Sequence, residues 1–541
     1  MKLKFENIMW GYALLLVGAT WFSGLFIDLT GDAGLYAAIS RQMVESGDWL
    51  NLKINGAPYD QKPHLLFWLA GAGIKIFGNT NFAFKIFPVL FGLTGVYFTF
   101  RLGKLLFSEE AGRWAALFAG TSQIFFLYFL DIHTDSVLQA GVTFSLWQLA
   151  RYLKDRKITG FIFGFSGVGL AMLSKGPVGA VIPFFAVLFF LILNKDFRQL
   201  FHPKWLLGII IILVIISPSL FHLYRNFGME GIRFYFITNN FGRVSGEYAG
   251  SNTDYLFYFH TILWAFLPWT VFVAFALFSE IKSWKNKVTR DCWGVCLLGG
   301  VLVLTAILSI AKGKAPNYFL MAVSPVSVIA GRWVTRMKNL PPKKEKVLFW
   351  FQRVLLMLLA IVFVVVVFTS SGKNTWLFIV FILLGSHSFI GAFRFRAYNK
   401  GNILLHTLVI AGSLNLFMNV SYIPGLFQYQ GARQALEIYE EEKGAGDRLV
   451  NLQLEEYELF YWANAPVENF TNWEDFYLFL ENRGSWVYTN QRGYDVVRQL
   501  VPALDTVYEI PQRGMNEITA AFLNPATREG SLNNNYLIRV K

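Results

Sequence analysis

Charged residues are scarce in this sequence, and cysteine is nearly absent. Only 15% of the 541 residues are Asp, Glu, Lys or Arg, against about 25% in ordinary soluble domains, whereas 55% are hydrophobic. The two cysteines, Cys292 and Cys296, are too few for a disulfide framework and lack His or Asp neighbours at metal-ligand spacing, so we expect free thiols. The composition argues against a soluble globular enzyme and favours a polytopic helical membrane protein.

Basic residues outnumber acidic ones by 48 to 35, which leaves a formal net charge of +13. Nucleic-acid binding would require these residues to cluster on a soluble face. They lie instead in short loops between apolar segments. The distribution of basic residues among these loops therefore indicates membrane topology, and we expect no nucleic-acid partner.

Apolar stretches of about 17–25 residues, long enough to cross a bilayer, recur from residue 8 to about residue 420. We predict thirteen membrane spans, near residues 8–27, 82–100, 112–130, 133–150, 158–174, 178–194, 205–223, 255–279, 293–311, 316–335, 347–369, 375–393 and 402–420. The apolar segment 65–77 is too short to cross, so we expect it in the interface or dipping into the bundle.

The loops between these spans differ in basic residues. With a cytoplasmic N-terminus, the inner loops hold 25 Lys and Arg residues and the outer loops hold twelve. The positive-inside rule then predicts that the N-terminus is inside, and thirteen spans place the C-terminal region outside.

From about residue 431 the sequence alternates helix and strand signals, which is typical of a small α/β domain. We expect strands at 448–454, 458–463, 485–490, 506–510, 518–523 and 536–540. The chain thus divides into a transmembrane domain over 1–430, with a juxtamembrane loop at 28–81, and a soluble domain over 431–541. The soluble domain has no glycine-rich phosphate loop or metal-ligand spacing, so we expect it to cap the site or guide an acceptor.

Ionisable residues gather at the predicted outer ends of the spans, where they are costly unless they have a role. These segments are Asp28–Tyr36, Tyr59–His64, Asp131–Asp135, Ser174–Pro177, Asn239–Arg243 and Lys312–Tyr318. The bland alternatives are that Asp28 or Asp32 caps the following helix, that Lys75, Lys85 and Lys373 extend to the interface, and that His64 and His133 are packing residues.

Two carboxylates lie at the same predicted membrane depth as several Lys, Arg and Tyr residues. This combination suits a reaction at an anionic group. The cations would hold an anionic phosphate, and a carboxylate would take a proton from an attacking hydroxyl. The pattern indicates a phosphate-bearing lipid whose head group reacts at the interface.

Seven motifs carry a resemblance to a known family. They are Gly31–Tyr36, Tyr59–Pro63, Thr134–Asp135, Leu173–Gly176, Phe241–Arg243, Leu267–Trp269 and Ser309–Lys314, the last followed by Pro316 and Tyr318. In order and spacing they resemble the polytopic GT-C type lipid-phosphate-sugar glycosyltransferases, which include the aminoarabinose transferases and the protein O-mannosyltransferases. The resemblance implies an all-α membrane domain with a small α/β domain, in the bacterial cytoplasmic membrane. It also implies inverting transfer of a sugar from undecaprenyl phosphate to a lipid A, glycan or protein acceptor on the periplasmic face.

The resemblance also assigns roles to individual residues. It places Asp32 and Asp135 at the family's catalytic carboxylates, and Lys62, Arg243 and Tyr318 where the family holds the donor phosphate. Candidate supporting residues are Lys175, Lys312, Lys314 and His64.

The sequence departs from the family at its metal ligands. In the aminoarabinose-transferase branch a Glu precedes the matching Lys, and a Glu/His run precedes the matching Arg. Here those places hold Gln61 and Thr238–Asn240, and neutral amides and hydroxyls are poor zinc ligands. We therefore predict no metal cofactor, although Asp60 leaves a hard ion such as Mg²⁺ open.

A transporter or lipid flippase is the competing class, because it too would have many spans and charged interior residues. Such a protein should show internal repeats and charges near mid-span. The sequence has no convincing repeat, and its charges lie at one membrane face.

Overall fold

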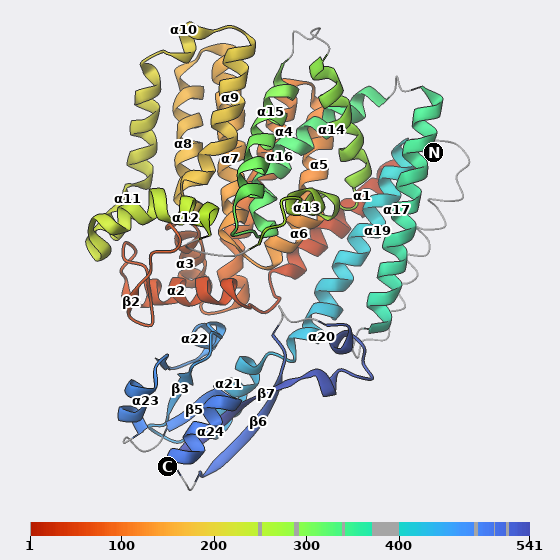
Figure 1. Ribbon diagram of the computed structural model, residues 1–541. Coiled ribbons are helices and arrows are strands. Elements are labelled where there is room, and N and C mark those ends of the chain that lie inside the picture. The colour runs from red at the N-terminus through yellow and green to blue at the C-terminus, as the bar shows by residue number, and fades with distance from the viewer. Residues whose placement is uncertain are drawn as a thin grey trace.

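The chain folds into a large helical bundle with a small sheet-containing domain at one end (Figure 1). The computed structural model describes residues 2–246, 252–285, 292–337, 341–369, 400–480, 485–501, 504–514 and 519–540. The N-terminus lies at the end of the bundle remote from the sheet domain, which contains the C-terminus (Figure 1).

The bundle is made of helices of very different length. They are α1 (Lys2–Gly24), α2 (Asp32–Ser46), α3 (Leu65–Phe77), α4 (Asn81–Leu106), α5 (Glu109–Gly120), α6 (Gln123–Leu130), α7 (Thr134–Asp155), α8 (Ile158–Lys175), η1 (Pro177–Ala180), α9 (Val181–Leu193), α10 (Phe197–Leu200), α11 (Lys204–Arg233), η2 (Phe234–Thr238), α12 (Asn239–Ser245), α13 (Phe257–Ala265), α14 (Thr270–Lys285), α15 (Trp293–Ile310), η3 (Pro316–Ala322), α16 (Val323–Arg336), α17 (Pro342–Thr369), α19 (Lys400–Phe417), η5 (Met418–Tyr422) and α20 (Ile423–Phe427). A short hairpin, β1 (Lys53–Ile54) with β2 (Ala57–Pro58), lies between α2 and α3.

Seven candidate spans among the described residues are long and apolar enough to cross a membrane. The protein is therefore a multi-pass membrane protein, but the count of thirteen spans is not confirmed. The predicted span 375–393 lies outside the described residues. The segment 65–77 forms the short helix α3, as its length predicts.

Two predicted spans, 112–130 and 255–279, are wrong as continuous helices. The first is divided at Thr121–Ser122 into α5 and α6, and the second between α13 and α14. Pro268 has no backbone N–H and disfavours helix in the residue before it, which ends α13. The two breaks pack together, because Gln123 N–H donates to Leu267 O at 2.8 Å and the Trp269 indole to the Thr121 hydroxyl at 2.8 Å.

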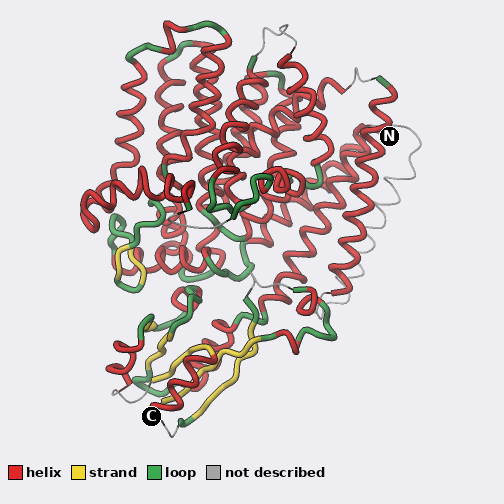
Figure 2. The backbone as a smooth tube through the Cα atoms, in the orientation of Figure 1, coloured by secondary structure: helices red, strands yellow, loops and turns green. Residues whose placement is uncertain are grey.

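Helices and strands alternate in the C-terminal region, where the strands form one mixed sheet (Figure 2). The elements are α21 (Gly431–Glu442), β3 (Arg448–Leu452), α22 (Glu458–Trp462), β4 (Val467–Phe470), α23 (Trp473–Leu480), β5 (Ser485–Asn490), α24 (Gln491–Leu500), β6 (Thr506–Gln512), α25 (Ala520–Leu523), η7 (Glu529–Ser531) and β7 (Asn533–Val540). The strand order is β4-β3-β5-β7-β6, with β3 parallel to β4 and β5, and β7 antiparallel to β5 and β6.

Two of the strands predicted for this region are wrong. Residues 458–463 and 518–523 contain the short helices α22 and α25, while β4 was not predicted. Short apolar runs do not distinguish strand from helix, and the tertiary contacts decide between them. The strands expected near 448, 485, 506 and 536 are confirmed as β3, β5, β6 and β7.

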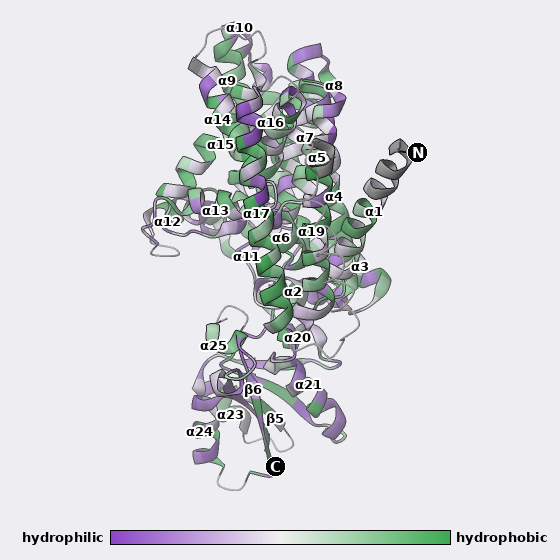
Figure 3. Cartoon of the chain, turned by 90° about the vertical axis from the view of Figure 1, so that its right-hand side faces the viewer, coloured by the Kyte–Doolittle hydropathy of each residue, from purple (hydrophilic) through white to green (hydrophobic). Residues whose placement is uncertain are grey.

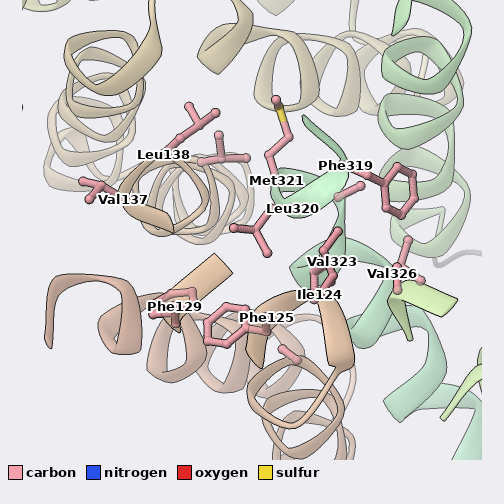
Figure 4. Packing of buried hydrophobic residues seen from close by; sticks show 14 of the residues in the cluster. Ile124, Phe125, Phe129, Val137, Leu138, Phe319, Leu320, Met321, Val323 and Val326 are labelled. Atoms are coloured by element: carbon pink, nitrogen blue, oxygen red, sulfur yellow. The ribbon is translucent and has the colours of Figure 1, made fainter. Parts of the chain in front are cut away.

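Apolar residues cover most of the bundle, and hydrophilic residues are more frequent in the sheet domain (Figure 3). Inside the bundle, Phe125 and Phe129 of α6 belong to the same buried cluster as Leu138 of α7 and Leu320 of η3 (Figure 4). This packing fixes the start of α7 beside η3, and both elements carry site residues. Cys292 and Cys296 do not form a disulfide bond, as expected.

Candidate active site

Asp32 is the first residue of α2, at the end of the bundle that faces the sheet domain (Figure 1). Gly31 before it has a φ of 54°, and Gly47 at the other end of α2 has a φ of 69°; both values favour glycine and set the limits of the helix. The Asp32 side chain is 58% exposed and accepts a hydrogen bond from the Tyr36 hydroxyl at 3.3 Å. The carboxylate is therefore open to an incoming group.

Asp28 does not cap α2, so the capping prediction is wrong. The N-cap of α2 is Gly31, which makes no side-chain capping bond. The Asp28 carboxylate instead accepts from the Asn81 amide at 2.7 Å and pairs with the Arg433 guanidinium of the sheet domain.

Tyr36 is buried directly behind Asp32. Burial, the nearby Tyr59 and the negative charges of Asp32 and Asp135 raise the pKa of the Tyr36 hydroxyl well above its ordinary value. Because it keeps its proton, Tyr36 acts as a hydrogen-bond donor that orients the Asp32 carboxylate.

His133 lies between two carboxylates at the start of α7. Its Nε2 is 2.9 Å from Asp131 Oδ2, and its Nδ1 is 3.7 Å from Asp32 Oδ2. The sequence left His133 undecided between packing and function, and the fold brings it to Asp32. The signal for this was the spacing Asp131-Ile-His133-Thr-Asp135 at the start of a span.

Asp135 forms a buried ion pair in the first turn of α7. Its Oδ2 accepts from Lys175 Nζ at 2.5 Å and from Asn317 Nδ2 at 2.8 Å, and its side chain is only 1% exposed. Lys175 Nζ also lies 4.0 Å from the centre of the Tyr318 ring. Asp135 thus holds the Lys175 ammonium group, which in turn lies over the Tyr318 ring. Asn317 completes this group, although only its position beside Tyr318 marked it in the sequence.

Lys62 and Lys175 line the same narrow pocket. Its lining residues are Asp60, Gln61, Lys62, Pro63, His64, Lys175, Ser219, His222, Leu223, Tyr235 and Asn239. Residues from the loop before α3, the end of α8, α11 and α12 therefore meet, and they bring two ammonium groups to one small polar site.

His64 stabilises the wall of this pocket. Its Nδ1 is 2.8 Å from the Ser219 hydroxyl and its Nε2 is 3.1 Å from Leu50 O. Burial lowers the pKa of His64 to about 4, so the ring is neutral at physiological pH. These contacts fit a packing residue that fixes the loop carrying Lys62.

The other candidate cations are Lys312, Lys314 and Arg243. The first two lie away from the Lys62 pocket, and the side chain of the third is outside the described residues. Lys314 Nζ donates to Asn252 O at 2.7 Å and so holds the loop before α13, while Lys312 is exposed. Neither residue lines the Lys62 pocket. Arg243 is on α12, but its side chain lies outside the described residues.

Lys85 does not extend to the interface, which contradicts the prediction for it. It is fully buried and donates to the carbonyl oxygens of Gly24 at 3.3 Å and Ile27 at 2.8 Å. Carbonyl groups at a helix end lack partners within the helix, so Lys85 ties the end of α1 to α4. Lys75 is exposed as expected, and Lys373 lies outside the described residues.

The residues at the family's metal-ligand places do not fit zinc. Gln61 Nε2 donates to Asp60 Oδ1 at 2.5 Å, and Asn239 Nδ2 donates to Gln61 O at 3.4 Å. Within the described part of the chain, no group of three or more His, Cys, Asp or Glu residues is placed to hold a metal ion. That this protein works without a metal cofactor stays a prediction.

These features define a multi-pass membrane protein that gathers carboxylates and ammonium groups where its helices meet the sheet domain. A family model described as dolichyl-phosphate-mannose-protein mannosyltransferase matches residues 61–222. The undecaprenyl phosphate-alpha-4-amino-4-deoxy-L-arabinose arabinosyl transferase of Edwardsiella ictaluri is 27% identical over 318 residues, which cover 57% of this chain and 55% of that relative. An uncharacterized protein of Aquifex aeolicus is 26% identical over 323 residues, covering 60% of this chain and 62% of that protein.

The fold has a counterpart over its full length. The crystal structure of ArnT from Cupriavidus metallidurans bound to undecaprenyl phosphate matches with a TM-score of 0.73 over 100% of this chain and 99% of that chain, at 18% identity. The chain is therefore similar to the polytopic GT-C type lipid-phosphate-sugar glycosyltransferases, and the resemblance inferred from the sequence is confirmed. In sequence, the chain spans about half the length of the curated relatives it matches.

Proposed function

We propose that the protein is an inverting glycosyltransferase that moves a sugar from a polyprenyl phosphate, such as undecaprenyl phosphate, to an acceptor at the membrane surface. One observation carries this proposal: Lys175 joins the Lys62 pocket to Asp135, and His133, two residues before Asp135 in the chain, lies 3.7 Å from the Asp32 carboxylate. An exposed carboxylate and a pocket with two ammonium groups therefore belong to one connected site.

The pocket suits the phosphate of the donor lipid. The Lys62 and Lys175 ammonium groups and the Asn239 amide line it. They would stabilise the negative charge of the phosphate as the bond between the anomeric carbon and the phosphate oxygen breaks. Asp135 sets the position of Lys175 through their ion pair, so we assign it a positioning role toward the phosphate.

Asp32 suits the role of general base. An acceptor hydroxyl oxygen attacks the anomeric carbon, its proton passes to Asp32, and polyprenyl phosphate leaves from the opposite face. A single displacement inverts the anomeric carbon and needs no covalent enzyme nucleophile. Tyr36 orients the carboxylate, and His133 supplies a second polar neighbour.

The acceptor and the side of the membrane are the finer parts of the proposal. The basic loops support a cytoplasmic N-terminus, and the similarity to bacterial arabinosyl transferases supports an acceptor at the periplasmic face of a bacterial inner membrane. Lipid A, another envelope glycan and a protein hydroxyl are the candidate acceptors.

Mass spectrometry of reconstituted reactions tests the proposal. Purified protein would be mixed with bacterial membrane lipids as the source of donor and acceptor, and the products searched for addition of one sugar mass. Wild-type protein should form such a product, and Lys62→Ala should form much less. Lys75→Ala is the matched control, because Lys75 is an exposed lysine on the adjoining helix α3. Equal product from Lys62→Ala and wild type would contradict the phosphate assignment.

A further inference from the structure

The chain segment that carries Asp32 is held by the C-terminal sheet domain before α2 begins. The Gln430 side chain is buried and donates to Leu29 O at 2.9 Å, and Arg433 pairs with Asp28. Gln430 and Arg433 flank the start of α21. Contacts from the start of the sheet domain and the residue before it therefore hold the Leu29 backbone and the Asp28 side chain, three and four residues before Asp32.

Arg41 connects α2 to α22, which lies directly beneath it (Figure 1). Its Nη1 donates to the carbonyl oxygens of Phe460 at 3.2 Å, Tyr461 at 2.9 Å and Ala463 at 2.5 Å. The last carbonyl groups of a helix have no partner within it, so one guanidinium satisfies the end of α22. The Arg41 side chain is 12% exposed, and its Nε pairs with Glu45 at 2.6 Å.

Gly34 of α2 lies close to Glu458, the first residue of α22. A Cβ atom at this position would lie 2.8 Å from Glu458 Oε2 and 2.9 Å from the Glu458 backbone nitrogen. Only a residue without a side chain allows this spacing, and it lies two residues after Asp32.

The same short helix also holds the turn between α3 and α4. The Tyr461 hydroxyl donates to Thr80 O at 2.8 Å, and the Trp462 indole donates to Asn81 Oδ1 at 3.0 Å. Asn81 in turn donates to Asp28. Residues of α22 thus link both ends of the juxtamembrane loop.

We propose that the C-terminal domain sets the position of Asp32, with Arg41 as the main positioning residue and α22 as the surface on which α2 is held. The inference rests on the proposed function, in which Asp32 takes the acceptor's proton. The Asp32 side chain is more than half exposed, so its place relative to the acceptor depends on the backbone of α2. A displacement of about 1 Å in such a group can cost roughly 100-fold in rate.

Three variants, two of them at Arg41, test this proposal. Arg41→Gln removes the guanidinium, Arg41→Lys keeps an ammonium donor, and Gln430→Leu removes the separate contact to Leu29. Arg113→Gln is the matched control, because Arg113 also pairs with a Glu four residues away on its own helix, Glu109 of α5. Each protein would be assayed for turnover and donor KM and for hydrogen exchange in peptides covering residues 28–46.

Arg41→Gln should exchange faster over residues 28–46 and lose at least about tenfold in turnover, while its donor KM stays within about twofold of wild type. The donor pocket lies on other elements, so the donor KM should be unaffected by a local change in α2. A variant that is only less stable would not combine lower turnover with an unchanged donor KM. Arg41→Lys should recover most of the turnover, Gln430→Leu should show a smaller loss, and Arg113→Gln should match wild type.

Unchanged exchange in Arg41→Gln, or faster exchange with normal turnover, would overturn the proposal. A raised donor KM with normal turnover would also overturn it, since Arg41 would then act in donor binding. If wild-type protein transfers no sugar, the proposed function is wrong. Faster hydrogen exchange over residues 28–46 in Arg41→Gln would still support the conclusion that contacts with α22 stabilise α2.

Discussion

The contact between α22 and α2 should weaken as pH rises, because it buries the carboxyl group of Glu458. The Glu458 side chain is 5% exposed, and its Oε2 has no hydrogen-bond partner among the described residues. Burial, followed by the charge of Glu456, raises the pKa of Glu458 from 4.5 to about 8. Glu456 itself is satisfied by the Tyr488 hydroxyl at 2.8 Å and the Asn535 amide at 2.9 Å.

The magnitude follows from proton linkage. Glu458 keeps its proton in the folded protein up to about pH 8, whereas an exposed carboxyl loses it near pH 4.5. The folded state therefore binds more protons between these pH values, and its stability falls as pH rises through them. Each tenfold change in proton affinity corresponds to about 1.4 kcal/mol. The free energy of unfolding should therefore fall by on the order of 5 kcal/mol between acidic pH and pH 8 or above.

Glu458→Gln tests this reasoning, since the amide keeps the size of the carboxyl group and cannot ionise. Thermal unfolding of purified protein in detergent would be followed from pH 5 to pH 9. Wild type and Glu458→Gln should unfold at similar temperatures at pH 5, and the variant should be the more stable at pH 8 to 9. Glu455→Gln, at an exposed position nearby, should keep the pH dependence of wild type. The same pH dependence in Glu458→Gln and wild type would refute the argument.

Four further predictions follow from the site and the topology. Asp32→Asn should lower turnover roughly 10²–10⁴-fold with normal expression if Asp32 is the general base; near-normal turnover in reconstituted membranes would instead favour an acceptor that is already anionic, such as a phosphate. Gly34→Ala should destabilise the protein in thermal unfolding, because its Cβ would meet the Glu458 backbone nitrogen at 2.9 Å, whereas Gly18→Ala, with no atom within 4 Å, should not. Activity should survive EDTA, and elemental analysis should find no stoichiometric zinc; loss of activity on chelation with recovery on adding metal would contradict this. A reporter fused after Lys541 should be periplasmic, and a cytoplasmic signal would show that the predicted topology is wrong.

Local signals in the sequence located several elements closely. The short apolar run at 65–77 forms α3, and the β-branched and aromatic runs at 485–490 and 536–540 lie in β5 and β7. The motif Asp131–Asp135 pointed to the start of α7. Patterns of this kind act within one helix or strand, so they are visible without the fold.

Residues that depend on a distant partner could not be predicted in the same way. The run 458–463 has the composition of a strand, but α22 forms there because Arg41, more than four hundred residues away, satisfies its last carbonyl groups. Lys85 has the position of an interfacial lysine, yet the carbonyl groups at the end of α1 draw it into the bundle. Pro268 is a local helix breaker, whereas the break at Thr121 is stabilised by contacts with Leu267 and Trp269, which its own sequence segment does not show.

The sequence by itself determined the class of the protein, because the length and spacing of apolar runs are set by the bilayer and not by tertiary contacts. It also led to the prediction of functional roles for Asp32, Asp135 and Lys62, because ionisable residues at the ends of membrane spans are costly unless they have a role. Only the tertiary structure decided their partners: Asp135 pairs with Lys175, and Asp32 lies on a helix held by the C-terminal domain. These pairings join residues from separate helices, and the distances between such residues are set by packing that no local pattern encodes.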